Sequence, residues 1–261
     1  MPALLRTVKP GWIVLLLVTV YALVMTAVAR DARADARELR LQAVVAERGA
    51  EGADAAAIAR DGAAPSAAAT PAAGVARDGW WLPVPGAELP SDDAYLPGAA
   101  RPYRDGTSQG FVFYGSDVGV PIVAGTPVIA ATDATVVRLD ASYREPGEDE
   151  WTDLLGEVAG GADEAQLDRL RGRQVWLEDD AGRTFRYGHL SAIEPDLRVG
   201  QRVARGQVIA RAGNSGTDDG VRGGDGGVRV QFEIWEDGAY FGDGLEPAAV
   251  RAEAAARFVG P

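Results

Sequence analysis

Cysteine is absent from the chain, and histidine occurs only once, at His189. The lack of cysteine excludes a disulfide framework and any metal site built on thiolates. A single imidazole also excludes metal sites built on several histidines. A site for a hard cation, made of carboxylates, stays open because aspartate and glutamate are plentiful.

An excess of positive charge is missing as well. The chain has 38 acidic and 26 basic residues, which gives a formal net charge of -12 at pH 7. Nucleic-acid binding needs a basic face, so we expect no nucleic-acid partner. With 261 residues, of which 47% are hydrophobic, the chain can bury a sizeable core but not several large domains.

The N-terminal region has the pattern of a membrane anchor. Residues 1–10 carry Arg6 and Lys9 and no acid, and an uncharged apolar run from Trp12 to Ala29 follows. That length predicts a transmembrane helix over residues 11–29, acting as an uncleaved signal anchor. The flanking positive charges place residues 1–10 in the cytoplasm and the rest outside, in a single-pass protein of the cell membrane. Alternatively, cleavage after Ala29 would secrete the domain. Both interpretations export it.

Residues 30–79 have the composition of a stalk and linker. The first part is charged and alanine-rich, and the stretch from Gly49 to Ala76 consists mainly of Ala, Gly, Pro, Ser and Thr, which cannot bury a core. Ordered structure is predicted to begin at Trp80-Trp81. This pair either pins the lead-in segment onto the domain or forms a sugar-stacking platform.

Beyond residue 80 the pattern is mainly β. Short runs of β-branched and aromatic residues, separated by glycines, predict strands; they lie at residues 125–130, 134–137, 174–178, 184–190, 199–209 and 228–234. An acidic, partly helical insertion at about residues 140–173 interrupts them. We therefore expect a β domain over residues 80–247 with an antiparallel sheet or sandwich core, followed by a helical segment at residues 248–261.

The stretch from Phe185 to Pro247 resembles a known family. It contains Tyr187-Gly-His-Leu190, Val199-Gly-Gln-Arg-Val203, Gly213-Asn-Ser-Gly216 and Arg229-Val-Gln-Phe-Glu233. Their order is similar to that in the core domain of the LytM/lysostaphin-type zinc peptidases, which cut peptidoglycan cross-bridges. The resemblance covers about residues 101–247, and it implies a sheet of the duplicated hybrid motif type.

The resemblance also implies where the family's zinc ligands would lie. A histidine and an aspartate of the first motif fall on Ser108 and Val112, and the third ligand falls on Gln231. A second alignment places the aspartate at Asp117 and still loses the histidine. At most one ligand is kept, and amide oxygen and valine do not replace imidazole. We therefore predict that zinc is absent and that the domain has no cofactor.

Two further positions correspond to residues that assist the attacking water in the family. These are His189, which is kept, and Arg229, which replaces a histidine. Arginine stays protonated, so it cannot act as a general base, and both residues are predicted to be catalytic vestiges. His189 is either a hydrogen-bonded residue at a strand end or part of a binding groove. In the second case Ser108, His189, Arg229 and Gln231 line the groove, and Arg229 pairs with a carboxylate of a peptide.

Three functions remain open on these residues. The first is an exported, catalytically inactive peptidase-fold domain that binds peptidoglycan or a cell-envelope protein, with a role in regulating cell-wall hydrolysis. The second is an active metalloendopeptidase whose unconventional metal site uses Asp117, His189 and a carboxylate of the insertion. The third is a lipoyl-type hairpin adaptor built on residues 199–209. A carrier of that type is excluded, because Lys9 is the single lysine.

Overall fold

The structure, a computed structural model, describes residues 79–260. The predicted cytoplasmic segment, the transmembrane helix over residues 11–29 and the stalk up to residue 78 lie outside the described residues. In the part that is described, no helix combines the length and apolar character needed to cross a bilayer.

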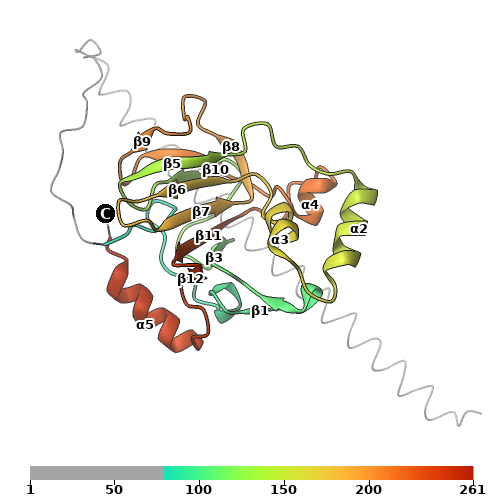
Figure 1. The fold of residues 1–261 in the computed structure, drawn as a ribbon, viewed down its shortest axis with the longest axis horizontal. Helices are drawn as coiled ribbons and strands as arrows, with labels where there is room; N and C mark the ends of the chain where they lie inside the picture. Colours follow the sequence, from blue (N-terminus) through green and yellow to red (C-terminus); the bar gives the residue numbers. More distant parts are fainter. Residues whose placement is uncertain (1–78, 261) are drawn as a thin grey trace, which may run out of the picture. The chain divides into compact units, whose positions relative to one another are not determined.

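Two antiparallel sheets form the domain (Figure 1). The larger sheet has the strand order β12 (Ala239–Tyr240), β11 (Arg229–Glu236), β7 (Thr184–Gly188), β6 (Val175–Glu178), β5 (Ala134–Leu139) and β9 (Arg202–Val203). Strand β3 (Phe111–Tyr114) pairs with the first half of β11, and β12 pairs with its end. The smaller sheet has the order β4 (Pro127–Ile129), β10 (Val208–Ala212) and β8 (Leu190–Ile193). A short ribbon joins β1 (Ala100–Arg101) to β2 (Gly106–Thr107). The prediction of a mainly β, antiparallel core is confirmed.

The core lies between the two sheets because alternate residues of each strand point inward. Phe185 and Tyr187 of β7, Phe232 of β11 and Ile209 of β10 are completely buried. Each large apolar side chain of this kind stabilises the fold by about 1.5–3 kcal/mol. The buried hydroxyl of Tyr187 accepts a hydrogen bond from the backbone N–H of Ala131 at 2.9 Å. The sheets therefore form a rigid support for the residues at their ends.

One side of the core is closed by the C-terminal helix α5 (Pro247–Arg257) and by the lead-in segment, which is the described chain before β1 (residues 79–99). Helix α5 buries Val250 and Ala254, which lie four residues apart on one face. Trp80 is 5% exposed and packs edge-to-face on Phe185 and Phe258, with ring centroids 5.5 Å and 5.7 Å apart. Trp80 therefore pins the lead-in segment and presents no open face to a sugar.

The acidic stretch between β5 and β6 contains α2 (Glu148–Val158) and α3 (Glu164–Leu170). The buried residues of α2 are Trp151, Leu154 and Val158, which share one helix face. They pack with two leucines of α3 in a hydrophobic cluster distinct from the main core. Figure 1 shows α2, α3 and the short α4 (Asp218–Val221) together at one end of the domain, away from α5.

Candidate functional site

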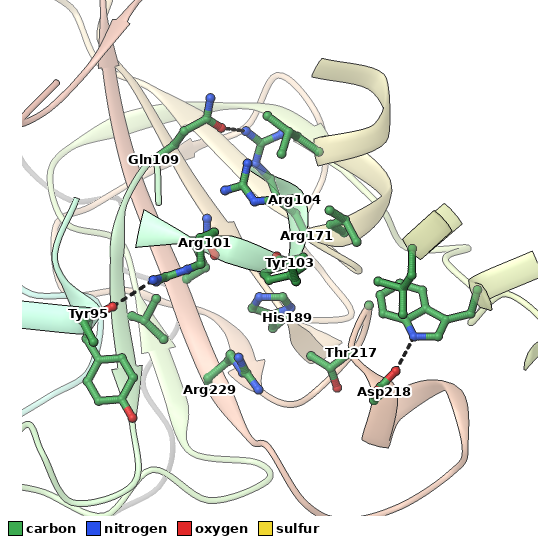
Figure 2. A pocket seen from close by; sticks show the side chains of 18 residues that line it. Tyr95, Arg101, Tyr103, Arg104, Gln109, Arg171, His189, Thr217, Asp218 and Arg229 are labelled. Atoms are coloured by element: carbon green, nitrogen blue, oxygen red, sulfur yellow. Dashed lines mark hydrogen bonds between the residues drawn. The ribbon is translucent and has the colours of Figure 1, made fainter. Parts of the chain in front are cut away.

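A cavity of about 460 Å³ lies between the ends of the sheet strands and the inserted helices. One wall comes from β3, β11 and the 3-10 helix η2 (Pro102–Arg104), and the other comes from α2, α3 and residues 216–218. Figure 2 shows His189 near the middle of this cavity, with arginines on one side and Thr217 and Asp218 on the other.

The strand register brings four of the predicted site residues together. In the antiparallel pairing, Gln231 of β11 lies opposite Val112 of β3 and also opposite Gly188 of β7. His189 directly follows Gly188, and Arg229 lies two residues before Gln231 on the same face of β11. Val112, His189, Arg229 and Gln231 all line the cavity.

Two other predicted residues lie elsewhere. Ser108 is 1% exposed and is not among the residues that line the cavity, and its hydroxyl donates to the carbonyl oxygen of Gly110 at 2.9 Å. Its neighbour Gln109 lines the cavity instead. Asp117 lies in the turn after β3, where its carboxylate accepts the backbone N–H of Ser91 at 2.8 Å. Asp117 is therefore directed to the lead-in segment and not to the cavity.

His189 is held in one orientation by backbone groups. It has φ 59°, the left-handed conformation that lets the chain turn from β7 into β8, and its N–H donates to the carbonyl of Arg171 at 2.8 Å. Its Nδ1 lies 2.8 Å from the carbonyl oxygen of Ser215, which can only accept, so Nδ1 carries the proton and Nε2 is an acceptor. Burial, together with the charges of Arg229 and Arg171, lowers the pKa of His189 to about 3. The ring is therefore neutral at pH 7.

The buried carboxylate of Glu233 accepts hydrogen bonds from the side chains of Arg171, Gln231 and Trp235. It is 1% exposed, and its Oε1 accepts from Arg171 Nε at 2.8 Å and from Gln231 Nε2 at 2.7 Å. Its Oε2 accepts from Trp235 Nε1 at 2.8 Å. Arg171 follows the last residue of α3, so this network ties the inserted helices to β11 and orients the amide of Gln231.

Three cavity arginines, Arg101, Arg104 and Arg229, form no ion pair within residues 79–260; we call them the arginine cluster. Arg101 NH1 donates to the carbonyl of Ala94 at 3.0 Å, and Arg229 Nε donates to that of Gly227 at 2.8 Å. Arg104 is 7% exposed, and its Nε has no hydrogen-bond partner among the described residues. The cavity therefore presents unpaired positive charge.

The opposite wall is mostly apolar. It is formed by Trp151 and Leu155 of α2 and by Leu167 and Leu170 of α3. The acid on this wall is Asp218, whose Oδ1 accepts from Trp151 Nε1 at 2.5 Å. The cavity thus combines a cationic side with an apolar side.

The arginine cluster and the apolar wall were not predicted from the sequence. The segment Arg101-Pro-Tyr-Arg104 carries two arginines three residues apart, but this spacing alone does not indicate a binding site. In η2, with Pro102 at its start, this spacing places both side chains toward the cavity. The sequence predicts that the insertion is partly helical, but it does not indicate which part of the domain these helices cover.

Comparison with known proteins gives a family match. Residues 154–242 match the sequence model described as Peptidase family M23. This confirms the resemblance to the LytM/lysostaphin-type peptidases, and the matched segment contains His189, Arg229 and Gln231. No curated protein matches the chain.

Several solved structures are also similar. A zinc-containing peptidase from Vibrio cholerae is 21% identical, with a TM-score of 0.41, over 63% of this chain and 39% of that chain. The catalytic domain of lysostaphin from Staphylococcus simulans is 20% identical, with a TM-score of 0.34, over 56% of this chain and 82% of that chain. A chain of the SpoIIQ–SpoIIIAH pore-forming complex is 20% identical, with a TM-score of 0.38, over 62% of this chain and 87% of that chain. The present chain thus spans less than half of the Vibrio cholerae peptidase.

Proposed function

We propose that this chain, whose residues 154–242 match peptidase family M23, is an exported, membrane-anchored binding domain that holds no zinc and has no hydrolytic activity. Its ligand is a peptide of the cell envelope, belonging to a peptidoglycan stem or to an envelope protein, and its role is to regulate cell-wall hydrolysis. Export and anchoring rest on residues 11–29, which lie outside the described residues.

The pairing of Val112 with Gln231 in the cavity wall is the observation that carries this proposal. A catalytic zinc site has three protein ligands and one open position for water. Valine offers no ligand atom, and Gln231, whose Nε2 donates to Glu233, offers only an amide oxygen, which does not replace imidazole as a zinc ligand. His189 Nε2 is one good ligand atom for zinc, and the guanidinium groups of the arginine cluster repel a dication. These residues do not fit zinc.

The same residues do fit a peptide. The neutral His189 Nε2 and the amide oxygen of Gln231 are acceptors for backbone N–H groups, and Arg229 attracts a carboxylate. The cavity volume of about 460 Å³ lies within the range of about 300–1,000 Å³ that is usual for small ligands. A short peptide segment is therefore a better match than a folded surface.

The two alternative functions have less support. The unconventional metal site needs Asp117 beside His189, but the carboxylate of Asp117 is bonded to Ser91. The adaptor needs a hairpin at residues 199–209, but β9 pairs with β5 in the larger sheet while β10 pairs with β4 and β8 in the smaller one.

Purified peptidoglycan tests the proposal. The full-length chain, in detergent, is expected to sediment with peptidoglycan or to retain a specific envelope protein, and to release no new amino termini from peptidoglycan. Adding zinc or a chelator is expected to change neither result. Arg229→Ala should weaken the interaction, whereas Arg202→Gln should not, because Arg202 is exposed and paired with Asp180 at 2.6 Å. Release of amino termini that stops with the chelator would overturn the proposal.

A further inference from the structure

We propose that the arginine cluster binds the free carboxylate at the C-terminal end of a peptide, and that the apolar wall receives the last side chain of that peptide. This inference rests on the proposed function, and it assigns the chemistry of the ligand that the cavity selects. The three arginines come from two separate segments, η2 with its preceding residue and the start of β11, which converge on the cavity in Figure 2.

The guanidinium groups of the arginine cluster lack counter-charges in the described domain. Buried charges are normally paired, because an isolated charge away from water is costly. Arg104 is nine-tenths buried, and its Nε lacks any hydrogen-bond partner among residues 79–260. Burial, together with the nearby charges of Arg104 and Arg229, lowers the pKa of Arg101. An anion held among the three guanidinium groups relieves their mutual repulsion and supplies the counter-charge that they lack.

Each guanidinium has donors left for this anion. A guanidinium carries five N–H donors in a planar fork that matches a carboxylate. Arg101 uses NH1 on the backbone, Arg104 uses NH2 on the carbonyl of Thr107, and Arg229 uses Nε on that of Gly227. Arg229 also lies over the ring of Tyr114, 5.5 Å from its centroid, which helps to fix its plane. The remaining N–H groups are available for charge-assisted hydrogen bonds.

The apolar wall favours a peptide carboxylate over an inorganic anion as the ligand. Trp151 and Leu155 of α2 and Leu170 of α3 face the cavity that the arginine cluster also lines. An inorganic phosphate would satisfy the arginines and leave this wall in contact with water. A peptide end offers a carboxylate and an apolar side chain separated by two bonds, so it covers both sides of the cavity. Tyr103 lines the cavity and is 51% exposed, which places it at the opening.

A pair of peptides tests the inference on the full-length chain. The probe is N-acetyl-Ala-Ala-Leu with a free carboxylate, and its partner is the same peptide with a C-terminal amide. The acid is expected to bind about 10-fold more tightly or better, because charge-assisted hydrogen bonds are roughly twice as strong as neutral ones. Arg104→Gln and Arg229→Gln are expected to remove this preference. The matched variant Arg202→Gln, at an exposed arginine that does not line the cavity, should keep this preference.

Each other outcome identifies what has failed. Equal affinity of the unaltered chain for acid and amide overturns the carboxylate site even if a variant fails to fold, and sedimentation with peptidoglycan then leaves the proposed function intact. Binding of inorganic phosphate in place of the acid peptide, with loss in Arg104→Gln, also overturns it in favour of a phosphate site. If the chain binds neither peptide and retains neither peptidoglycan nor an envelope protein, both proposals fail.

Discussion

Replacing Glu233 with leucine is expected to lower the free energy of unfolding by about 3–5 kcal/mol, because it leaves a buried guanidinium without its counter-charge. Arg171 is 4% exposed by side chain, and the Nε–Oε1 distance to Glu233 is 2.8 Å. Its remaining acidic partner, Glu164, has a half-exposed side chain and offers a weaker, screened pair. Urea denaturation of the two proteins measures the difference.

A double substitution separates this charge effect from a loss of packing. In Arg171→Met with Glu233→Leu neither charge of the closer pair remains, and Arg186, 3.8 Å from Glu233, keeps its pair with Glu164 at 2.9 Å, so the loss is expected to be smaller than in Glu233→Leu alone. Glu178→Leu is the matched control at an exposed position of β6, where we expect a change within about 0.5 kcal/mol. If Glu233→Leu destabilised the domain no more than Glu178→Leu, the buried pair would not be what holds α3 against β11.

The stability of the domain is expected to fall between pH 7 and pH 5 by about 2 kcal/mol on account of His189 alone. The folded-state pKa of His189 is about 3, whereas an unfolded histidine has a pKa of about 6.5. The folded state therefore keeps the ring neutral, and its contribution is complete above pH about 6.5. As the pH falls below that value the unfolded state takes up the proton first, and about 1.4 kcal/mol is lost per pH unit until the folded state also protonates near pH 3.

The variant His189→Asn isolates this effect. Asparagine tolerates the left-handed backbone conformation at this position, and its amide can donate to the carbonyl of Ser215. Unfolding free energies of both proteins at pH 7 and pH 5 give the comparison, since carboxylates that titrate in this range affect both alike. A loss between the two pH values that is equal in the two proteins would mean that His189 is not held neutral by burial and by the charges of Arg229 and Arg171.

Much of the fold was predictable because its signals are local. Short β-branched runs such as the one in β11, and turns such as Asp179-Asp-Ala-Gly182, give strands and hairpins directly from residue type. The order of the family motifs assigned Val112 and Gln231 to two of the family's zinc-ligand positions, and the two residues are paired in the sheet. Such predictions rest on residues that are close in sequence or tied by a known order of motifs.

The binding features were not predictable because they depend on contacts between distant segments. Arg104 and Trp151 line the same cavity, but nothing in either local sequence indicates the other. Ser108 was expected in the groove, and only the geometry of the backbone shows that its hydroxyl is used by Gly110. The insertion has no counterpart in the motifs quoted from the family, so its position over the cavity could only come from the structure.

Titration of the metal-free, full-length chain with zinc tests most directly whether this cavity receives an anion and not a dication. We predict no saturable binding of zinc in the micromolar range, and unchanged affinity for the free-carboxylate peptide when zinc is added. Tight binding of one zinc ion per chain, lost in His189→Asn and required for peptide binding, would contradict the account.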